Sequence, residues 1–165
     1  AQSYENHLKV ININFIGVIN GIYSCVELLK NTPNSLCLST SSSTGVIGLP
    51  MTSVYSASKH AVKGLTESLS AEFSRFGTRV SDILPGVIDT PLIGEEIRVN
   101  LPNEGMWRLI SSEEIAKTVL RAYEENRIHW YVPEDLEDLE MLVVKDPIKA
   151  RDEVIKTGPM KMPSK

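Results

Sequence analysis

The chain has 165 residues, of which 42% are hydrophobic and 23% charged, so it can bury a core and is not intrinsically disordered. Its length predicts a single domain over residues 1–165. The 17 basic and 21 acidic side chains give a net charge of −4. Proteins that bind nucleic acids usually carry an excess of basic residues, so a nucleic-acid partner is not expected. No apolar run approaches the roughly 18 residues of a membrane span, and the N-terminus has no signal-peptide pattern. We therefore expect a cytoplasmic protein without a membrane partner.

Two cysteines, Cys25 and Cys37, are too few for a disulfide framework and lack metal-ligand spacing. They indicate buried thiols in a reducing cytoplasm, and no metal site is expected.

A long helix is predicted over residues 3–30. Its apolar residues advance by three and four in alternation and so form one stripe, which consists of Leu8, Ile11, Phe15, Val18, Ile22, Cys25 and Leu29. Ser3 is the expected N-cap, and Pro33 ends the element. Asn14 lies one turn before Gly17 on nearly the same face, and glycine inside a helix indicates a close approach to the backbone.

A short strand over 35–41 runs into a loop of Ser, Thr and Gly that ends at Pro50. A second long helix is predicted over 54–76, with Gly77 as its C-cap. The buried side of this helix is expected to carry Ala61, Val62, Leu65, Leu69, Phe73 and Phe76.

Residues 79–84 are predicted to form a strand, and residues 87–110 are expected to be mostly irregular. A third helix over 112–126 should turn Ile115, Val119, Leu120 and Tyr123 inward, and residues 129–132 form a last strand. The segment 134–165 is acidic and then basic, with one helix near 136–144 and a loose tail. Helices and strands in alternation indicate an α/β fold in which helices flank a parallel, partial doubly wound sheet.

Tyr55 and Lys59 lie four residues apart near the start of the second helix, so their side chains share one face. A phenol with a pKa of about 10 is a poor acid at neutral pH, but a nearby ammonium favours the phenolate and allows proton transfer to a developing alkoxide. By itself the pair is equally compatible with a surface Tyr and Lys. Ser42 follows the first strand, at the end of a parallel sheet where ligands bind, although residues 39–43 alone would be interpreted as a polar loop.

Four sequence features, which follow one another along the chain as they do in the short-chain dehydrogenase/reductase family, give this chain a resemblance to that family. The family's active-site stretch is matched by Ser42-x-x-Gly45, Pro50 and Tyr55-Ser56-Ala57-Ser58-Lys59. Asn14 resembles the helix asparagine of the family's four-residue active site, and Pro85-Gly86-Val87-Ile88-Asp89-Thr90 resembles its motif at the nicotinamide end of the cofactor. The resemblance covers about residues 1–125 and implies the C-terminal catalytic part of a Rossmann-type domain.

The resemblance implies an NAD(P)-dependent oxidoreductase that interconverts a carbonyl and a secondary alcohol. Tyr55 would be the general acid/base, and Lys59 would lower the pKa of Tyr55 and bind the nicotinamide ribose. Ser42 would hold the substrate oxygen, and Asn14 would anchor a water between Lys59 and solvent. The cofactor, NAD or NADP, would be bound by Tyr55, Lys59, Pro85, Gly86, Val87, Ile88 and Thr90. Residues 91–110 match the family's substrate lid in position; their apolar side chains would either line a substrate pocket or pack against the sheet.

The sequence departs from the family at its N-terminal end, because it has no glycine-rich nucleotide-binding turn. Either the chain is a fragment of a longer enzyme or it is a natural truncation, and the complete set of Asn14, Ser42, Tyr55 and Lys59 favours the fragment.

A second hypothesis is a non-catalytic module in which helices 3–30 and 54–76 form a homodimer surface, as the corresponding helices do in this family. A serine hydrolase is disfavoured because no GxSxG occurs.

Overall fold

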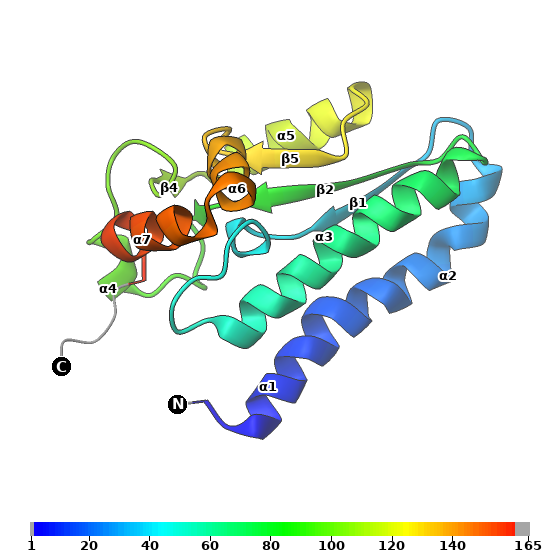
Figure 1. Cartoon of the computed structure of the whole chain (residues 1–165). Helices are drawn as coiled ribbons and strands as arrows, with labels where there is room; N and C mark the ends of the chain where they lie inside the picture. The colour runs from blue at the N-terminus through cyan, green and yellow to red at the C-terminus, as the bar shows by residue number, and fades with distance from the viewer. Residues whose placement is uncertain (1, 161–165) are drawn as a thin grey trace.

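Three parallel strands form the centre of the computed structural model, which describes residues 2–160 (Figure 1). They are β1 (Leu36–Thr40), β2 (Arg79–Pro85) and β5 (His129–Val132), in the order β1-β2-β5. Leu36 pairs with Arg79, and Asp82 pairs with His129. The predicted parallel α/β architecture is confirmed.

Helices cover both faces of this sheet (Figure 1). One face carries the continuous helical segment of α1 (Tyr4–Ile11), the π-helical turn η1 (Asn12–Ile16) and α2 (Gly17–Asn31), with α3 (Ser53–Ser74) beside it. The other face carries α5 (Ser112–Glu124). Side chains alternate along β2, so Val80 packs with Phe73 of α3 whereas Ile83 packs with Ala122 of α5.

The segment Tyr4–Asn31 begins with the predicted cap, because the Ser3 hydroxyl accepts a hydrogen bond from the Asn6 amide. Its 28 residues are long and apolar enough to cross a membrane by length and composition, with a hydropathy of 1.3, so the statement that no such run exists was wrong. Core helices of globular proteins pass the same test, but they are mostly buried, whereas no residue of this apolar window is buried within residues 2–160. Here Ile22, Val26 and Leu29 pack against the buried cluster of Cys37, Phe73 and Val80.

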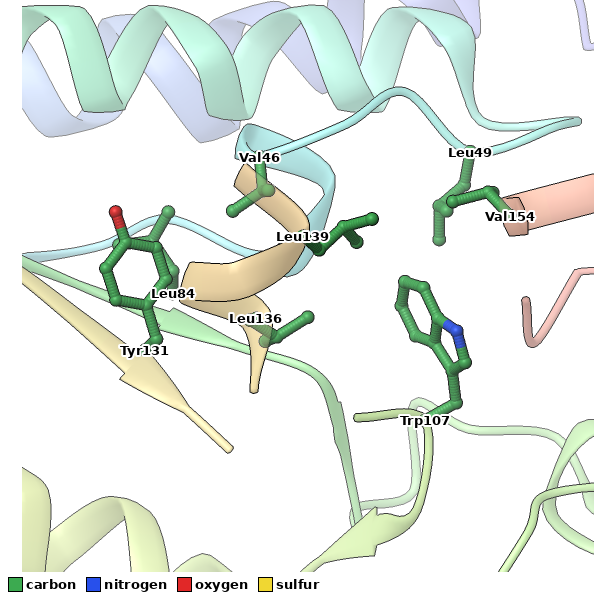
Figure 2. Packing of buried hydrophobic residues seen from close by; sticks show 8 residues of the cluster. All are labelled: Val46, Leu49, Leu84, Trp107, Tyr131, Leu136, Leu139 and Val154. Atoms are coloured by element: carbon green, nitrogen blue, oxygen red, sulfur yellow. The ribbon is translucent and has the colours of Figure 1, made fainter. Parts of the chain in front are cut away.

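The prediction of a loose tail was wrong up to residue 157, because two helices follow β5. They are α6 (Leu136–Lys145) and α7 (Pro147–Thr157). Figure 2 shows how they close the largest cluster of buried side chains, which consists of Val46, Leu49, Leu84, Trp107, Tyr131, Leu136, Leu139 and Val154. Burial of Leu136, Leu139 and Val154 fixes both helices, and the Asp146 carboxylate caps α7 by accepting from the Lys149 amide. Residues 161–165 lie outside the described part.

The predicted inward face of α5 was wrong for three of its four residues, whereas Ile115 is half-buried and packs against the core cluster. Thr118 and Ala122 are buried, whereas Val119, Leu120 and Tyr123 are exposed. Arg79 explains this orientation, because its guanidinium lies over the Tyr123 ring and donates hydrogen bonds to the carbonyls of Ala122, Tyr123 and Glu125. Phe76 at the end of α3 is exposed as well, with Lys30 and Arg75 over its ring.

Residues 87–110 contain a two-stranded parallel sheet of β3 (Val87–Ile88) and β4 (Leu109–Ile110), with the short helix α4 (Glu95–Arg98) between them. The apolar residues of this segment divide into two groups. Trp107 and Ile110 are buried in the core, whereas Leu92 and Val99 are exposed. The expectation of packing is therefore confirmed for Trp107 and Ile110, whereas the lining of a substrate pocket by this segment stays a prediction.

Candidate active site

Tyr55 and Lys59 occupy the first two turns of α3 and converge, as the four-residue spacing predicts. The Lys59 Nζ atom lies 5.7 Å from the centroid of the Tyr55 ring, and both side chains are half-buried. Nζ donates a 2.9 Å hydrogen bond to the carbonyl of Thr40, the last residue of β1. Burial lowers the pKa of the Lys59 ammonium. Helix α3 is thus joined to the carboxyl end of β1 by Lys59.

Asn14 lies in the π-helical turn η1, where the Gly17 amide donates to the carbonyl of Asn12. The Asn14 Nδ2 atom donates a 3.2 Å hydrogen bond to Ser58 Oγ, and the Ser58 hydroxyl donates to the Tyr55 carbonyl at 2.6 Å. Asn14 is therefore joined to α3 through Ser58 and not through Lys59. Both Asn14 and Lys59 nevertheless line one cavity of about 610 Å³ between α2 and β1.

The Ser42 loop lies against the same helix. Its 3₁₀ turn η2 (Ser43–Gly45) follows Ser42, whose Oγ accepts a 3.2 Å hydrogen bond from the Thr44 amide. The Ser41 hydroxyl donates to the carbonyl of Lys59 at 2.9 Å. A Cβ atom on Gly45 would lie 2.6 Å from Ser41 Oγ and 3.1 Å from the Lys59 carbonyl oxygen, so this approach requires glycine. Within residues 2–160, no hydrogen bond joins Ser42 to Tyr55.

The Pro85–Thr90 motif lies at the same edge of the sheet, because the Ser41 amide donates to the carbonyl of Ile83. Gly86 packs closely there: a Cβ atom would lie 3.2 Å from both Ile110 Cδ1 and the Met106 carbonyl oxygen. The next residues are held by Arg98, which pairs with the Asp89 carboxylate and donates to the Thr90 carbonyl at 3.3 Å. The sheet therefore brings the motif, the Ser42 loop and Lys59 to one edge.

Three positions that matter for this geometry were not predicted from the sequence. They are the Thr40 carbonyl under Lys59, the Ser41 hydroxyl on the Lys59 carbonyl, and the Ser58 hydroxyl on Asn14. Ser58 carried a signal, because it lies one turn after Tyr55 on a helix whose neighbour presents an asparagine.

Comparison with known proteins places the chain in a family. The model of the family described as short chain dehydrogenase matches residues 2–101, which is more than half of the sequence. The chain therefore belongs to the short-chain dehydrogenase family.

Individual relatives agree with this assignment. The chain is 33% identical over 90 residues to levodione reductase from Leifsonia aquatica, covering 54% of this chain and 34% of the relative. It is 32% identical over 118 residues to cyclohexanol dehydrogenase from Acinetobacter sp. (strain SE19), covering 71% and 47%. It thus spans less than half the length of these curated relatives.

A crystal structure of a short chain dehydrogenase from Burkholderia cenocepacia J2315 in complex with NADP shares the fold. The TM-score is 0.78 at 24% identity, and the match covers 94% of this chain and 61% of that one.

Proposed function

We propose that this chain is the catalytic portion of an NAD(P)-dependent oxidoreductase that interconverts a carbonyl and a secondary alcohol. The observation that carries the proposal is the convergence of Tyr55 and Lys59 at the carboxyl end of the parallel sheet. The relatives support it, because their names describe a reductase and a dehydrogenase. Since the chain spans less than half of those relatives, the activity is proposed for the protein with its nucleotide-binding portion.

The residues present fit the nicotinamide end of a dinucleotide. The Lys59 ammonium has three N–H donors and uses one of them in its hydrogen bond to the Thr40 carbonyl. The other two remain for ribose hydroxyls beside the cavity that Lys59 lines. Thr44 Oγ1, within the Ser42 loop, is buried without a hydrogen-bond partner in the part of the chain described. Pro85 to Ile88, with Thr90, would hold the carboxamide. When bound, the cofactor supplies the hydride chemistry.

The chain's own residues would position the substrate and move a proton. Tyr55 would donate its hydroxyl proton to the substrate oxygen, and the Lys59 cation would stabilise the negative charge left on the phenol. Ser42 Oγ is an acceptor in its bond with the Thr44 amide, so its own O–H remains available to the substrate oxygen. Asn14, held by Ser58, would keep a water near Lys59 in their shared cavity.

The test is Tyr55→Phe, which keeps the ring and removes the proton. We expect turnover of NADH or NADPH with a panel of ketones to fall by roughly 100-fold or more. Tyr4→Phe, on an exposed tyrosine of α1, is the matched control and should retain full activity. Turnover by Tyr55→Phe within twofold of the parent would remove the assignment.

We also propose that two copies associate through α2 and α3. These helices form a groove of about 190 Å³ with apolar walls of Ile19, Ile22, Tyr23, Val26, Leu65, Leu69 and Phe73. Tyr23 is exposed at its rim. Light scattering should show a dimer that Tyr23→Glu converts to a monomer, whereas Leu92→Glu on an exposed residue elsewhere should not. A parent chain that is monomeric at all concentrations would contradict this proposal.

The non-catalytic module is distinguished from the enzyme by cofactor titration. Binding of NADH or NADPH to the 165-residue chain with micromolar affinity would argue against a module that only associates. The apolar groove between α2 and α3 supports the non-catalytic module, although the same groove is equally compatible with an oligomeric enzyme.

A cytoplasmic location is proposed from the cysteines. Cys25 and Cys37 are both free thiols, but only Cys37 is buried, so the expectation of two buried thiols was wrong for Cys25. An exposed free thiol is typical of a reducing compartment.

A further inference from the structure

A second group of ionisable side chains joins α3 to the sheet, further along the helix from Tyr55. We name Asp82, His129 and Glu67 the His129 cluster. Asp82 on β2 is fully buried, and its Oδ1 lies 2.7 Å from His129 Nδ1 at the start of β5. The other ring nitrogen, Nε2, lies 3.2 Å from Glu67 Oε1 on α3. The imidazole therefore bridges two carboxyl groups that come from different elements.

The number of protons in the cluster follows from these contacts. Ionised carboxylates only accept hydrogen bonds, and a neutral imidazole has a single N–H to donate. A neutral ring between two ionised carboxylates would turn one of its lone pairs toward a carboxylate lone pair. The alternative is a protonated Asp82 that donates to a neutral ring, and it carries the same number of protons. We propose that His129 is held as an imidazolium between Asp82 and Glu67, and that this bound proton fastens α3 to β2 and β5.

The surrounding charges favour a cation at this position. On α3, Lys63 lies 2.9 Å from Glu67 and 2.6 Å from Glu140 of α6. On β5, the Tyr131 hydroxyl donates to Glu140, and its ring lies edge-on to His129. Glu67 and Glu140 thus share the Lys63 ammonium, whereas Asp82 has, among the residues described, only His129 as a contacting charge partner, and the imidazolium supplies that second positive charge.

Loss of the proton bound to His129 would be energetically unfavourable because of Asp82. Burial raises the pKa of the Asp82 carboxyl, and the hydrogen bond from His129 opposes that rise. Its second oxygen, Oδ2, is buried with no hydrogen-bond partner among residues 2–160. An ionised Asp82 without its imidazolium would be an uncompensated buried charge, which strongly destabilises a fold.

The cluster predicts a pH dependence of stability with a definite sign. The proposed imidazolium would keep, in the folded state, a proton that an ordinary unfolded histidine releases around pH 6.5. Above about pH 6.5 the folded state therefore binds more protons than the unfolded state, so stability falls as the pH rises. Hydrogen bonds from Lys63 lower the pKa of the Glu67 carboxyl. This shift makes stability rise with pH, but only in the acid range below the ordinary glutamate pKa of 4.5.

Nitrogen NMR of the imidazole rings tests the proposal directly. The sequence has only three histidines, His7, His60 and His129, so their signals are assigned by single substitutions to Gln. At about pH 8 we expect both ring nitrogens of His129 to carry protons, and the signals of exposed His60 provide the comparison in the same spectrum. Asp82→Asn, which keeps the side-chain shape, should convert His129 to a neutral ring. A neutral His129 in the parent at this pH would overturn the proposal.

A second measurement separates a bound proton from simple packing. The melting temperature of the parent should exceed that of His129→Gln at pH 6.5, and this difference should shrink by at least half at pH 9. Glu72→Gln, on an exposed carboxylate of α3 outside the cluster, should show a constant difference. A His129→Gln difference that is equally large at both pH values would show a structural role only, and would overturn the proposal. Neither measurement depends on catalysis, so the result stands apart from the proposed activity.

Discussion

Gly45→Ala tests whether the Ser42 loop must lie against α3. The added methyl would lie 2.6 Å from Ser41 Oγ and 3.1 Å from the Lys59 carbonyl oxygen, whereas ordinary contacts begin at 3.4 Å. The Ser41 hydroxyl would have to turn away, and its 2.9 Å hydrogen bond to Lys59 would be lost. That loss costs about 1 kcal/mol, and displacement of the loop from a backbone carbonyl adds a similar amount. We expect a loss of about 1–3 kcal/mol in the free energy of unfolding.

Urea denaturation followed by circular dichroism measures this loss. Gly64→Ala is the matched control, because its Cβ would meet nothing within 4 Å, and alanine in a helix should stabilise by up to about 1 kcal/mol. The contact with Ser41 is isolated by the double variant Ser41→Ala/Gly45→Ala, in which the cost of the Gly45 change should fall by at least about 0.5 kcal/mol. A Gly45→Ala variant as stable as Gly64→Ala would refute the close approach of loop and helix.

Two further predictions concern the C-terminal part of the fold. Leu136→Ala should lower the free energy of unfolding by about 2–5 kcal/mol, because this side chain is fully buried. Met141→Ala, on the exposed side of α6, should change the free energy of unfolding by less than about 0.5 kcal/mol. Equal effects of the two variants in urea denaturation would contradict the packing of α6. The hydrogen bond from Arg108 lowers the pKa of Glu114, so this pair stabilises above the ordinary glutamate pKa of 4.5 and loses its contribution as the pH falls further. Glu114→Gln should therefore be slightly less stable than the parent at pH 7 and equal to it near pH 3, and a difference that persists in acid would exclude the ion pair as its source.

The sequence predicted those features that depend on local spacing. The alternation of apolar residues located the helix observed at Ser53–Ser74, and the strand at His129–Val132 was predicted with its observed bounds. The four-residue spacing of Tyr55 and Lys59 was sufficient to place both side chains together. Local periodicity determines these features, so no knowledge of the rest of the chain was needed.

Features that depend on distant partners were not predictable in the same way. Which face of α5 turns inward depends on Arg79, which is 44 residues away from Tyr123 in the sequence. The bridge from His129 to Asp82 spans 47 residues and arises only because β2 and β5 are neighbours in register. Helix α7 did carry a local signal, namely Asp146 before Pro147, which is the capping pattern of a helix start.

The wide turn at Asn12–Ile16 has a consequence for how this chain tolerates changes in length. A π-helical turn accommodates one residue more than the α-helix around it, so deletion of a single residue there could leave an unbroken α-helix. Since the wide turn absorbs that extra residue, the same deletion would leave Tyr4–Ile11 and Gly17–Asn31 near their present alignment, but it would shift the side chains within the turn and move Asn14 from its place opposite Ser58. A shorter helix would therefore keep its packing against the neighbouring helix while losing the Asn14–Ser58 hydrogen bond, which makes these five residues a point where chain length and the geometry of the candidate site are coupled.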